Sequence, residues 1–153
     1  MTLTTEKLIN TAGLANKLLH EYGLYDKGWR FELSSTKRIV GQCNFDKKII
    51  VVSMNFMHSD PAEIEDTIRH EIAHALAGPE HGHDSTWRRY AIHVGARPER
   101  CAPPEVKSAA KPNYIIECTG CGRRWKRYRL RRSLANEVSI CCKTAFKFYR
   151  VKK

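Results

Sequence analysis

The chain has 153 residues, 42% of them hydrophobic, and a formal net charge of +11 at pH 7, which fits one core-forming domain with or without a small appendage. No apolar run approaches the length of a membrane-spanning helix, and the first residues lack the basic-then-apolar order of a secretory signal. We therefore expect an intracellular protein, cytoplasmic or nucleoid-associated (or in the host cytoplasm if it is viral), with no membrane partner.

Residues 6–53 predict one amphipathic helix followed by a small sheet. Apolar side chains recur at helical spacing between Glu6 and Tyr22, and Gly23 ends this helix. Residues 29–33, 38–45 and 48–53 have the pattern of strands, with Asp46 and Lys47 as the turn between the second and the third. We expect a small antiparallel sheet and a fold of the α+β class.

A second helix is predicted between Pro61 and Gly78. Asp60 is a suitable N-cap, Pro61 fits the first helical position, and Glu63 completes a capping box. Gly78 is followed by a proline, so the helix ends there after about five turns. Apolar residues at helical spacing give this helix one buried face.

This helix carries His70-Glu71-Ile72-Ala73-His74, an H-E-x-x-H sequence. Residues four apart project from one helical face, so His70 and His74 can bind one metal ion. Glu71 lies beside the metal without occupying it, where a general base belongs. The alternative, a core helix with two incidental histidines, leaves unexplained why Glu71 is so close to both. A catalytic zinc takes three protein ligands, so one more must come from elsewhere.

The third ligand is expected just downstream of the helix. The candidates there are Glu80, His81, His83, Asp84 and His93. A Gly-Pro turn can bring His83 back over the metal, and the helix that follows, capped by Asp84 and anchored by Trp87, would hold it in place. We therefore predict His83 as the third ligand, with His81, which has no such anchor, as the alternative.

Two segments together resemble the SprT-like family, which includes the Spartan-type proteases. They are His-Glu-Ile-Ala-His at residues 70–74 and His-Asp-Ser-Thr-Trp at residues 83–87, and the likeness spans most of residues 6–95. Many members have glycine after the third histidine, where this chain has Asp84. The resemblance implies a zincin fold, His83 as third zinc ligand and, for the better-known relatives, proteolysis of proteins on or crosslinked to DNA.

The charge is distributed unevenly along the chain. Residues 1–110 carry equal numbers of acidic and basic side chains, whereas residues 111–153 carry 13 Lys or Arg and only Glu117 and Glu137 as acids. The segment 106–112 contains small residues and a proline and is the best linker candidate. We therefore expect a zincin-like metallopeptidase domain over residues 1–105, a linker over 106–112 and a basic module over 113–153.

Four cysteines predict a zinc-ribbon-like β module in this tail. Cys118 and Cys121 form a C-x-x-C zinc knuckle, whereas Cys141 and Cys142 are adjacent. Neighbouring side chains of an extended strand point in opposite directions, so both can bind only if the backbone turns between them. Cysteines in these pairs indicate metal binding in a reducing compartment rather than disulfides. The alternative is a ribbon-like hairpin that has lost its metal.

A strongly basic segment lies between the two cysteine pairs. Its cations are Arg123, Arg124, Lys126, Arg127, Arg129, Arg131 and Arg132. Such cations neutralise phosphates, and Trp125 or Tyr128 could stack on an unpaired base. We expect DNA to bind here without sequence specificity; the alternative is a solvated basic strand whose aromatic side chains pack inside the module.

The sequence thus predicts a zinc-dependent metalloendopeptidase, monomeric, that acts on nucleic-acid-associated proteins. Zinc on the three histidines would polarise the carbonyl, Glu71 would accept and return the proton, and a second, structural zinc would lie on the cysteines. One alternative is a non-catalytic, nucleic-acid-associated factor of the transcription-elongation type with a structural zinc domain. Another is metal-assisted hydrolysis of a non-peptide bond. Glu71 favours an enzyme, because a structural zinc site needs no base.

Overall fold

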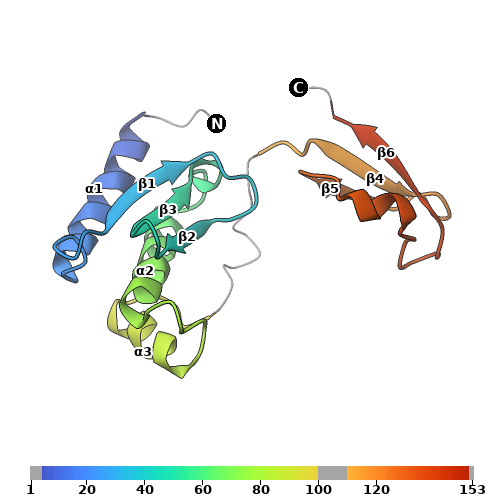
Figure 1. Cartoon of the computed structure of the whole chain (residues 1–153). Coiled ribbons are helices and arrows are strands. Elements are labelled where there is room, and N and C mark those ends of the chain that lie inside the picture. Colours follow the sequence, from blue (N-terminus) through green and yellow to red (C-terminus); the bar gives the residue numbers. More distant parts are fainter. Residues whose placement is uncertain (1–4, 100–109, 152–153) are drawn as a thin grey trace. The chain divides into compact units, whose positions relative to one another are not determined.

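The computed structural model describes residues 5–99 and 110–151 and divides the chain into two units, Met1–Ala109 and Ala110–Lys153 (Figure 1). Within the described ranges both units contain a small sheet and the three α-helices lie in the first, so the α+β class is confirmed. Most of the predicted linker 106–112 lies outside the described residues. Among those that are described, no helix combines the length and the apolar composition needed to span a membrane.

The first unit places its helices around one three-stranded sheet (Figure 1). Its elements in chain order are α1 (Thr5–Glu21), β1 (Arg30–Ser34), β2 (Gly41–Asn44), β3 (Ile49–Ser53), the 3-10 turn η1 (Met54–Phe56), α2 (Pro61–Ala77) and α3 (Ser85–His93). These bounds agree with the predicted helices to within a residue or two, whereas β2 is shorter than the predicted strand 38–45.

The sheet is mixed, with the order β1-β3-β2. β3 pairs with β2 in an antiparallel hairpin but with β1 in parallel, so the prediction of an antiparallel sheet is wrong for β1. Four consecutive apolar residues run from Ile49 to Val52 in β3, and both Ile50 and Val52 are only 1% exposed. A central strand loses most of its contact with water, so the most apolar strand takes the centre and separates β1 from β2.

Helix α2 is the centre of the first unit. Its buried residues Ile64, Ile68 and Ile72 pack in one cluster with residues of α1, β3 and α3. The Asp60 carboxylate accepts a hydrogen bond from a backbone amide in the first turn, as predicted for an N-cap. The side of α2 next to this apolar side faces β2 and carries His70 and His74.

The predicted capping box does not form. The carboxylate of Glu63 instead accepts hydrogen bonds from the guanidinium of Arg97, at 3.0 Å for Nη1–Oε1. Arg97 also donates to Asp66, through its backbone amide at 2.8 Å and its Nε at 3.0 Å. A charged partner outcompetes the backbone amide that a capping box would use. This cluster ties the segment after α3 to α2.

The second unit is a three-stranded antiparallel sheet with a short turn. Its elements are β4 (Tyr114–Cys118), β5 (Arg124–Arg127), the 3-10 turn η2 (Arg132–Asn136) and β6 (Phe146–Arg150), and the strand order is β5-β4-β6. Ile116 and Cys118 of β4 are 1% exposed, and Leu134 of η2 is 9% exposed. The buried group is small, which is typical of modules that depend on a metal for stability.

Candidate metal centres

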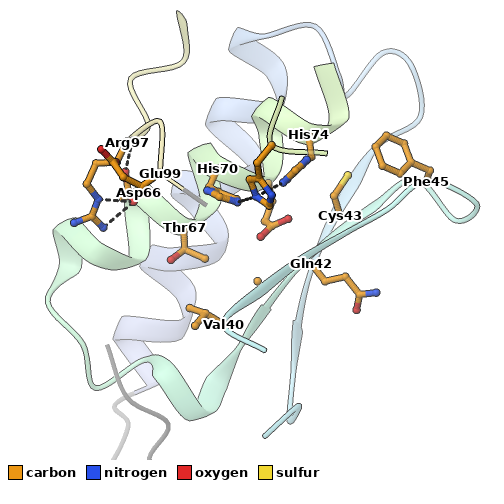
Figure 2. Close-up of a pocket in the computed structure, with 13 residues that line it drawn as sticks. Val40, Gln42, Cys43, Phe45, Asp66, Thr67, His70, His74, Arg97 and Glu99 are labelled. Atoms are coloured by element: carbon orange, nitrogen blue, oxygen red, sulfur yellow. Dashed lines mark hydrogen bonds and ion pairs between the residues drawn. The ribbon is translucent and has the colours of Figure 1, made fainter. Parts of the chain in front are cut away.

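The structure brings His70, His74 and His83 together. His70 and His74 lie on the side of α2 that faces β2 (Figure 2). Nε2 of His83 lies 3.1 Å from Nε2 of His70 and 3.2 Å from Nε2 of His74. Two nitrogen ligands of a tetrahedral zinc, each about 2.0–2.1 Å from the ion, lie about 3.3 Å apart. The three imidazoles therefore fit a zinc ion and leave its fourth position for another ligand.

Trp87 in the first turn of α3 fixes the position of this cluster. Its indole is fully buried, and its centroid lies 4.7 Å from the ring of His70, 5.2 Å from His74 and 4.5 Å from His83. Asp84 caps α3 by accepting a hydrogen bond from the Trp87 amide at 2.9 Å. The cap and the indole together hold the loop in the register that presents His83.

The alternative ligand His81 lies outside the histidine cluster. Its Nδ1 contacts the carboxylate of Asp84 at 2.7 Å, and its backbone forms a hydrogen bond with His74. A backbone partner on a metal-binding histidine orients the ring and fixes its tautomer. Of the other candidates, Glu80 and Asp84 are exposed, and His93 contacts Tyr22 edge-on.

The environment of the imidazoles favours the neutral form that binds metals. Burial, and then the neighbouring His74 and His83, lower the pKa of His70 to about 4. Burial and the proximity of His83 lower the pKa of His74 to about 4 as well. Both rings are therefore neutral at pH 7, and no proton has to leave them before a cation binds.

Glu71 is buried, at 7% exposure, beside the histidine cluster. Burial raises the pKa of its carboxyl group to about 8, and a backbone hydrogen bond from Cys43 opposes the rise. Without a metal the group is therefore largely protonated at neutral pH. A cation at the histidines would favour the carboxylate, because opposite charges stabilise each other more strongly away from water.

The cluster opens into a groove of about 390 Å³. One wall is the β2 segment with Val40, Gln42 and Cys43, and the other is α2 with Asp66, Thr67, His70 and His74 (Figure 2). His83, from the loop before α3, also lines the groove. The remaining lining residues are Gly41, Phe45, Glu71, Arg97 and Glu99.

The sequence did not indicate that β2 would form this wall. Cys43 of β2 is half-buried and lines the groove. Burial, and then the charge of Glu71, raise the pKa of its thiol to about 12. No spacing rule connects β2 with α2, because their contact depends on how the sheet packs against the helix.

The four predicted tail cysteines also lie together. The ligand atoms of Cys118, Cys121, Cys141 and Cys142 are within 4.8 Å of one another, and the Cys121 and Cys141 sulfurs are 3.5 Å apart. The backbone turns at residues 140–142, with Lys143 at a positive φ of 54°, so both adjacent cysteines reach the cluster. The donor set is that of a closed structural zinc site.

The surroundings of Cys118 favour a thiolate, whereas the neighbouring thiols raise the pKa of Cys142. Cys118 lies 3.1 Å from the hydroxyl of Ser139 and 3.3 Å from that of Thr144, and these contacts lower the pKa of its thiol. A Cβ at Gly120 would lie 2.7 Å from the Cβ of Cys142, so only glycine fits the knuckle. Thiolates are the form of cysteine that binds zinc.

All seven predicted basic residues are exposed, but they do not share one surface. Lys126 lies opposite Ile115, and Ile115 lies opposite Tyr149, so these three side chains share one face of the sheet. Arg127 lies opposite Tyr114, on the other face. Arg124 forms an ion pair with Glu117, so part of its charge is neutralised.

The two aromatic residues predicted to stack on bases are engaged within the module. Trp125 packs edge-on against Phe146 at 5.8 Å, and the Tyr128 hydroxyl donates a hydrogen bond to the Ala110 carbonyl. Tyr149 of β6 is 43% exposed and lies on the same sheet face as Lys126 and Lys147. The alternation of residues 146–150 would have predicted this face, had the strand been recognised.

The chain was compared with known families, curated proteins and solved structures. The model of the SprT-like family matches residues 14–108, which include the histidine cluster, Glu71 and Trp87. No curated protein and no solved structure matches the chain significantly.

We predict that His83→Ala weakens zinc binding far more than His81→Ala. Loss of one of three ligands should lower the affinity for zinc by more than about 100-fold. Loss of a residue that only contacts a ligand, as His81 does, should lower that affinity by about tenfold to 100-fold at most. The measurement is competition with a chromophoric chelator, in a Cys118→Ser/Cys121→Ser background that removes the second cluster. Equal losses, or a larger loss for His81→Ala, would contradict the assignment.

A second prediction concerns Glu71 in the zinc-free protein. Since its folded pKa of about 8 exceeds the ordinary 4.5, its contribution to stability is complete below pH 4.5 and is lost as the pH rises through 8. Glu71→Gln cannot ionise, so its melting temperature should exceed that of wild type by an amount that grows with pH. We expect the gap to widen by at least about 5 °C between pH 5 and pH 8.5, measured with chelator present. A constant gap would show that Glu71 is not desolvated.

Proposed function

Because the chain belongs to the SprT-like family, we propose that it is a zinc-dependent metalloendopeptidase. The observation that carries the proposal is the buried carboxyl group of Glu71 beside three imidazoles spaced for one zinc ion. We further propose that the first unit is a zincin-like peptidase domain and that the second is a basic zinc-ribbon module. A purely structural zinc domain would gain nothing from burying a carboxyl group that has no cationic side-chain partner next to its ligands.

The histidines would hold the zinc, and Glu71 would move the proton. When bound, zinc would supply positive charge that polarises a carbonyl and lowers the pKa of water. Glu71 would accept one proton from the attacking water as the carbon–oxygen bond forms, and would deliver it to the amine nitrogen as the peptide bond breaks. The proposed ligands are imidazoles and include no carboxylate, so they would not reduce the positive charge of the ion.

The free edge of β2 offers a place for the substrate. In the described sheet β2 pairs with β3 on one edge only, and the residues of β2 line the groove beside the histidines. An extended peptide can add to such an edge through main-chain hydrogen bonds. We propose that the substrate binds as an extended segment, so that an unfolded stretch of a protein is cleaved more readily than a folded one.

The second unit would provide affinity for nucleic acid. Lys126 and Lys147 lie on the same sheet face as the exposed ring of Tyr149. Glu117 lies on this face as well, where it forms an ion pair with Arg124 and accepts a hydrogen bond from the Tyr149 hydroxyl at 3.4 Å, but carboxylates are otherwise almost absent from this part of the chain. Cations contact phosphates whatever the bases are, and an exposed aromatic ring can stack on an unpaired base. We propose that the enzyme acts on proteins associated with DNA, which this unit would bring near the groove. The same surface would serve a non-catalytic, DNA-associated factor, and Glu71 distinguishes the two functions.

Glu71→Gln tests the catalytic proposal. The amide cannot accept a proton, so hydrolysis of an unfolded protein substrate should fall by at least about 100-fold. Zinc content should stay at the wild-type level, because Glu71 is not a ligand in the proposed site. The measurement is hydrolysis rate together with metal analysis of the same sample. Near wild-type hydrolysis would remove Glu71 as the base, and inactivity of wild-type protein with zinc bound would favour the non-catalytic factor.

Charge reversal on the face of Tyr149 tests the nucleic-acid proposal. Lys126→Glu/Lys147→Glu should weaken binding to single-stranded DNA at 50 mM salt and lower the slope of log affinity against log salt by about 1 or more. The matched control, Arg127→Glu/Arg150→Glu, changes the same charge on the opposite sheet face and should weaken binding less. Equal effects would show that the net charge binds DNA and that the face does not matter.

A further inference from the structure

The backbone of β2 passes Glu71 at a distance that only glycine allows. A Cβ atom at Gly41 would lie 2.7 Å from Oε1 and 2.9 Å from Cγ of Glu71, and 2.9 Å from Cγ2 of Thr67. Real Cβ contacts essentially never occur at such distances, and two of the three atoms belong to the buried side chain of Glu71. The constraint is therefore one of space around the Glu71 carboxyl group.

This contact is unusual among the glycines of the chain. Gly23, Gly28, Gly78, Gly95 and Gly122 have positive φ angles, which explains glycine there by conformation. Gly13 and Gly82 would have no atom within 4 Å of an added Cβ. Gly41 and Gly120 remain, and each lies against a side chain of a proposed functional site. For Gly41 that side chain is Glu71.

The edge of β2 also provides a polar contact to the same carboxyl group. Val40 accepts a hydrogen bond from the Ser53 amide, so by the alternation of an antiparallel pair the groups of Gly41 and Cys43 point away from β3. The Cys43 amide forms its backbone hydrogen bond with Glu71. The β2 backbone thus packs against the Glu71 carboxyl group at Gly41 and orients it through the hydrogen bond from the Cys43 amide.

We propose that Gly41 is a positioning residue for the hydrolysis described above, because it lets β2 hold the Glu71 carboxyl group in one place beside the metal-binding histidines. The inference rests on the proposed function. Glutamate has three rotatable side-chain bonds, and a general base must stay within hydrogen-bond reach of the proton that it takes. The β2 backbone at Gly41 and the hydrogen bond from the Cys43 amide restrict those rotations.

Gly41→Ala tests the proposal, with Gly13→Ala as the matched control. The added methyl group should displace the Glu71 carboxyl, and a displacement of about 1 Å can cost about 100-fold in rate. We expect kcat to fall by about tenfold to 100-fold with KM within about twofold of wild type. Zinc content, and the absorption spectrum of the cobalt-substituted protein, should be unchanged because the three imidazoles stay in place. Gly13→Ala should match wild type in every measurement.

A second variant separates positioning from general packing. Thr67→Ser removes the Cγ2 atom that a residue-41 Cβ would meet, but leaves the contact with Glu71. Gly41→Ala/Thr67→Ser should therefore remain slow relative to Thr67→Ser alone. The double variant has more room for the added methyl group than Gly41→Ala, so it can be measured in its place if Gly41→Ala alone fails to fold. Recovery of kcat in the double variant, or wild-type kcat in a folded, zinc-loaded Gly41→Ala, would overturn the proposal.

The amide resonance of Cys43 gives a readout that needs no peptidase activity. In zinc-free protein its ¹H–¹⁵N signal should shift in Glu71→Gln and in Gly41→Ala, and stay in place in Gly13→Ala. If wild type hydrolyses nothing, the proposed function fails, and this resonance still decides whether β2 holds Glu71. A Cys43 signal that responds to neither substitution would refute the contact itself.

Discussion

Helix α2 buries Ile64, Ile68 and Ile72 on one side, and that burial takes Glu71 out of water on the adjacent side. Burial of the isoleucines and desolvation of Glu71 cannot be separated, because residues 71 and 72 are neighbours on the same helical turn. The rest of the first unit accommodates this buried carboxyl. Trp87 covers the histidines from α3, and β2 approaches closely enough to contact the carboxyl through its backbone. The chemistry of the groove thus depends on the apolar packing of one helix.

The same desolvation acts on acids and bases in opposite directions. It lowers the pKa values of His70 and His74 and raises that of Glu71, so that all three are largely neutral at pH 7 when no cation is present. A cation between the imidazoles would reverse the balance for Glu71 and leave the histidines neutral. One ion would therefore both gain its ligands without competition from protons and convert the neighbouring acid into a base.

Local patterns predicted much of this, and long-range packing supplied the rest. The i, i+4 spacing of His70 and His74 and the N-cap Asp60 depend on one helix, so the sequence suffices for them. The grouping of His83 with them follows from a short loop beside a capped helix. The parallel pairing of β1 with β3 and the approach of Gly41 to Glu71 depend on sheet order, which no local rule contains. Glu63 fits a capping box in sequence, but Arg97, 34 residues away, takes its carboxylate.

The two ligand clusters differ in a way that supports separate roles. Three neutral imidazoles would leave a zinc ion with its full charge of +2 and one open position, which is the condition for polarising a substrate. Four thiolates would give the other zinc a net charge of about −2 and no open position. Such a centre would attract no carbonyl oxygen, but it would crosslink the end of β4 to the turn at residues 140–142. In a unit with few buried side chains, that crosslink would stabilise the sheet while the cations around it stay exposed to solvent.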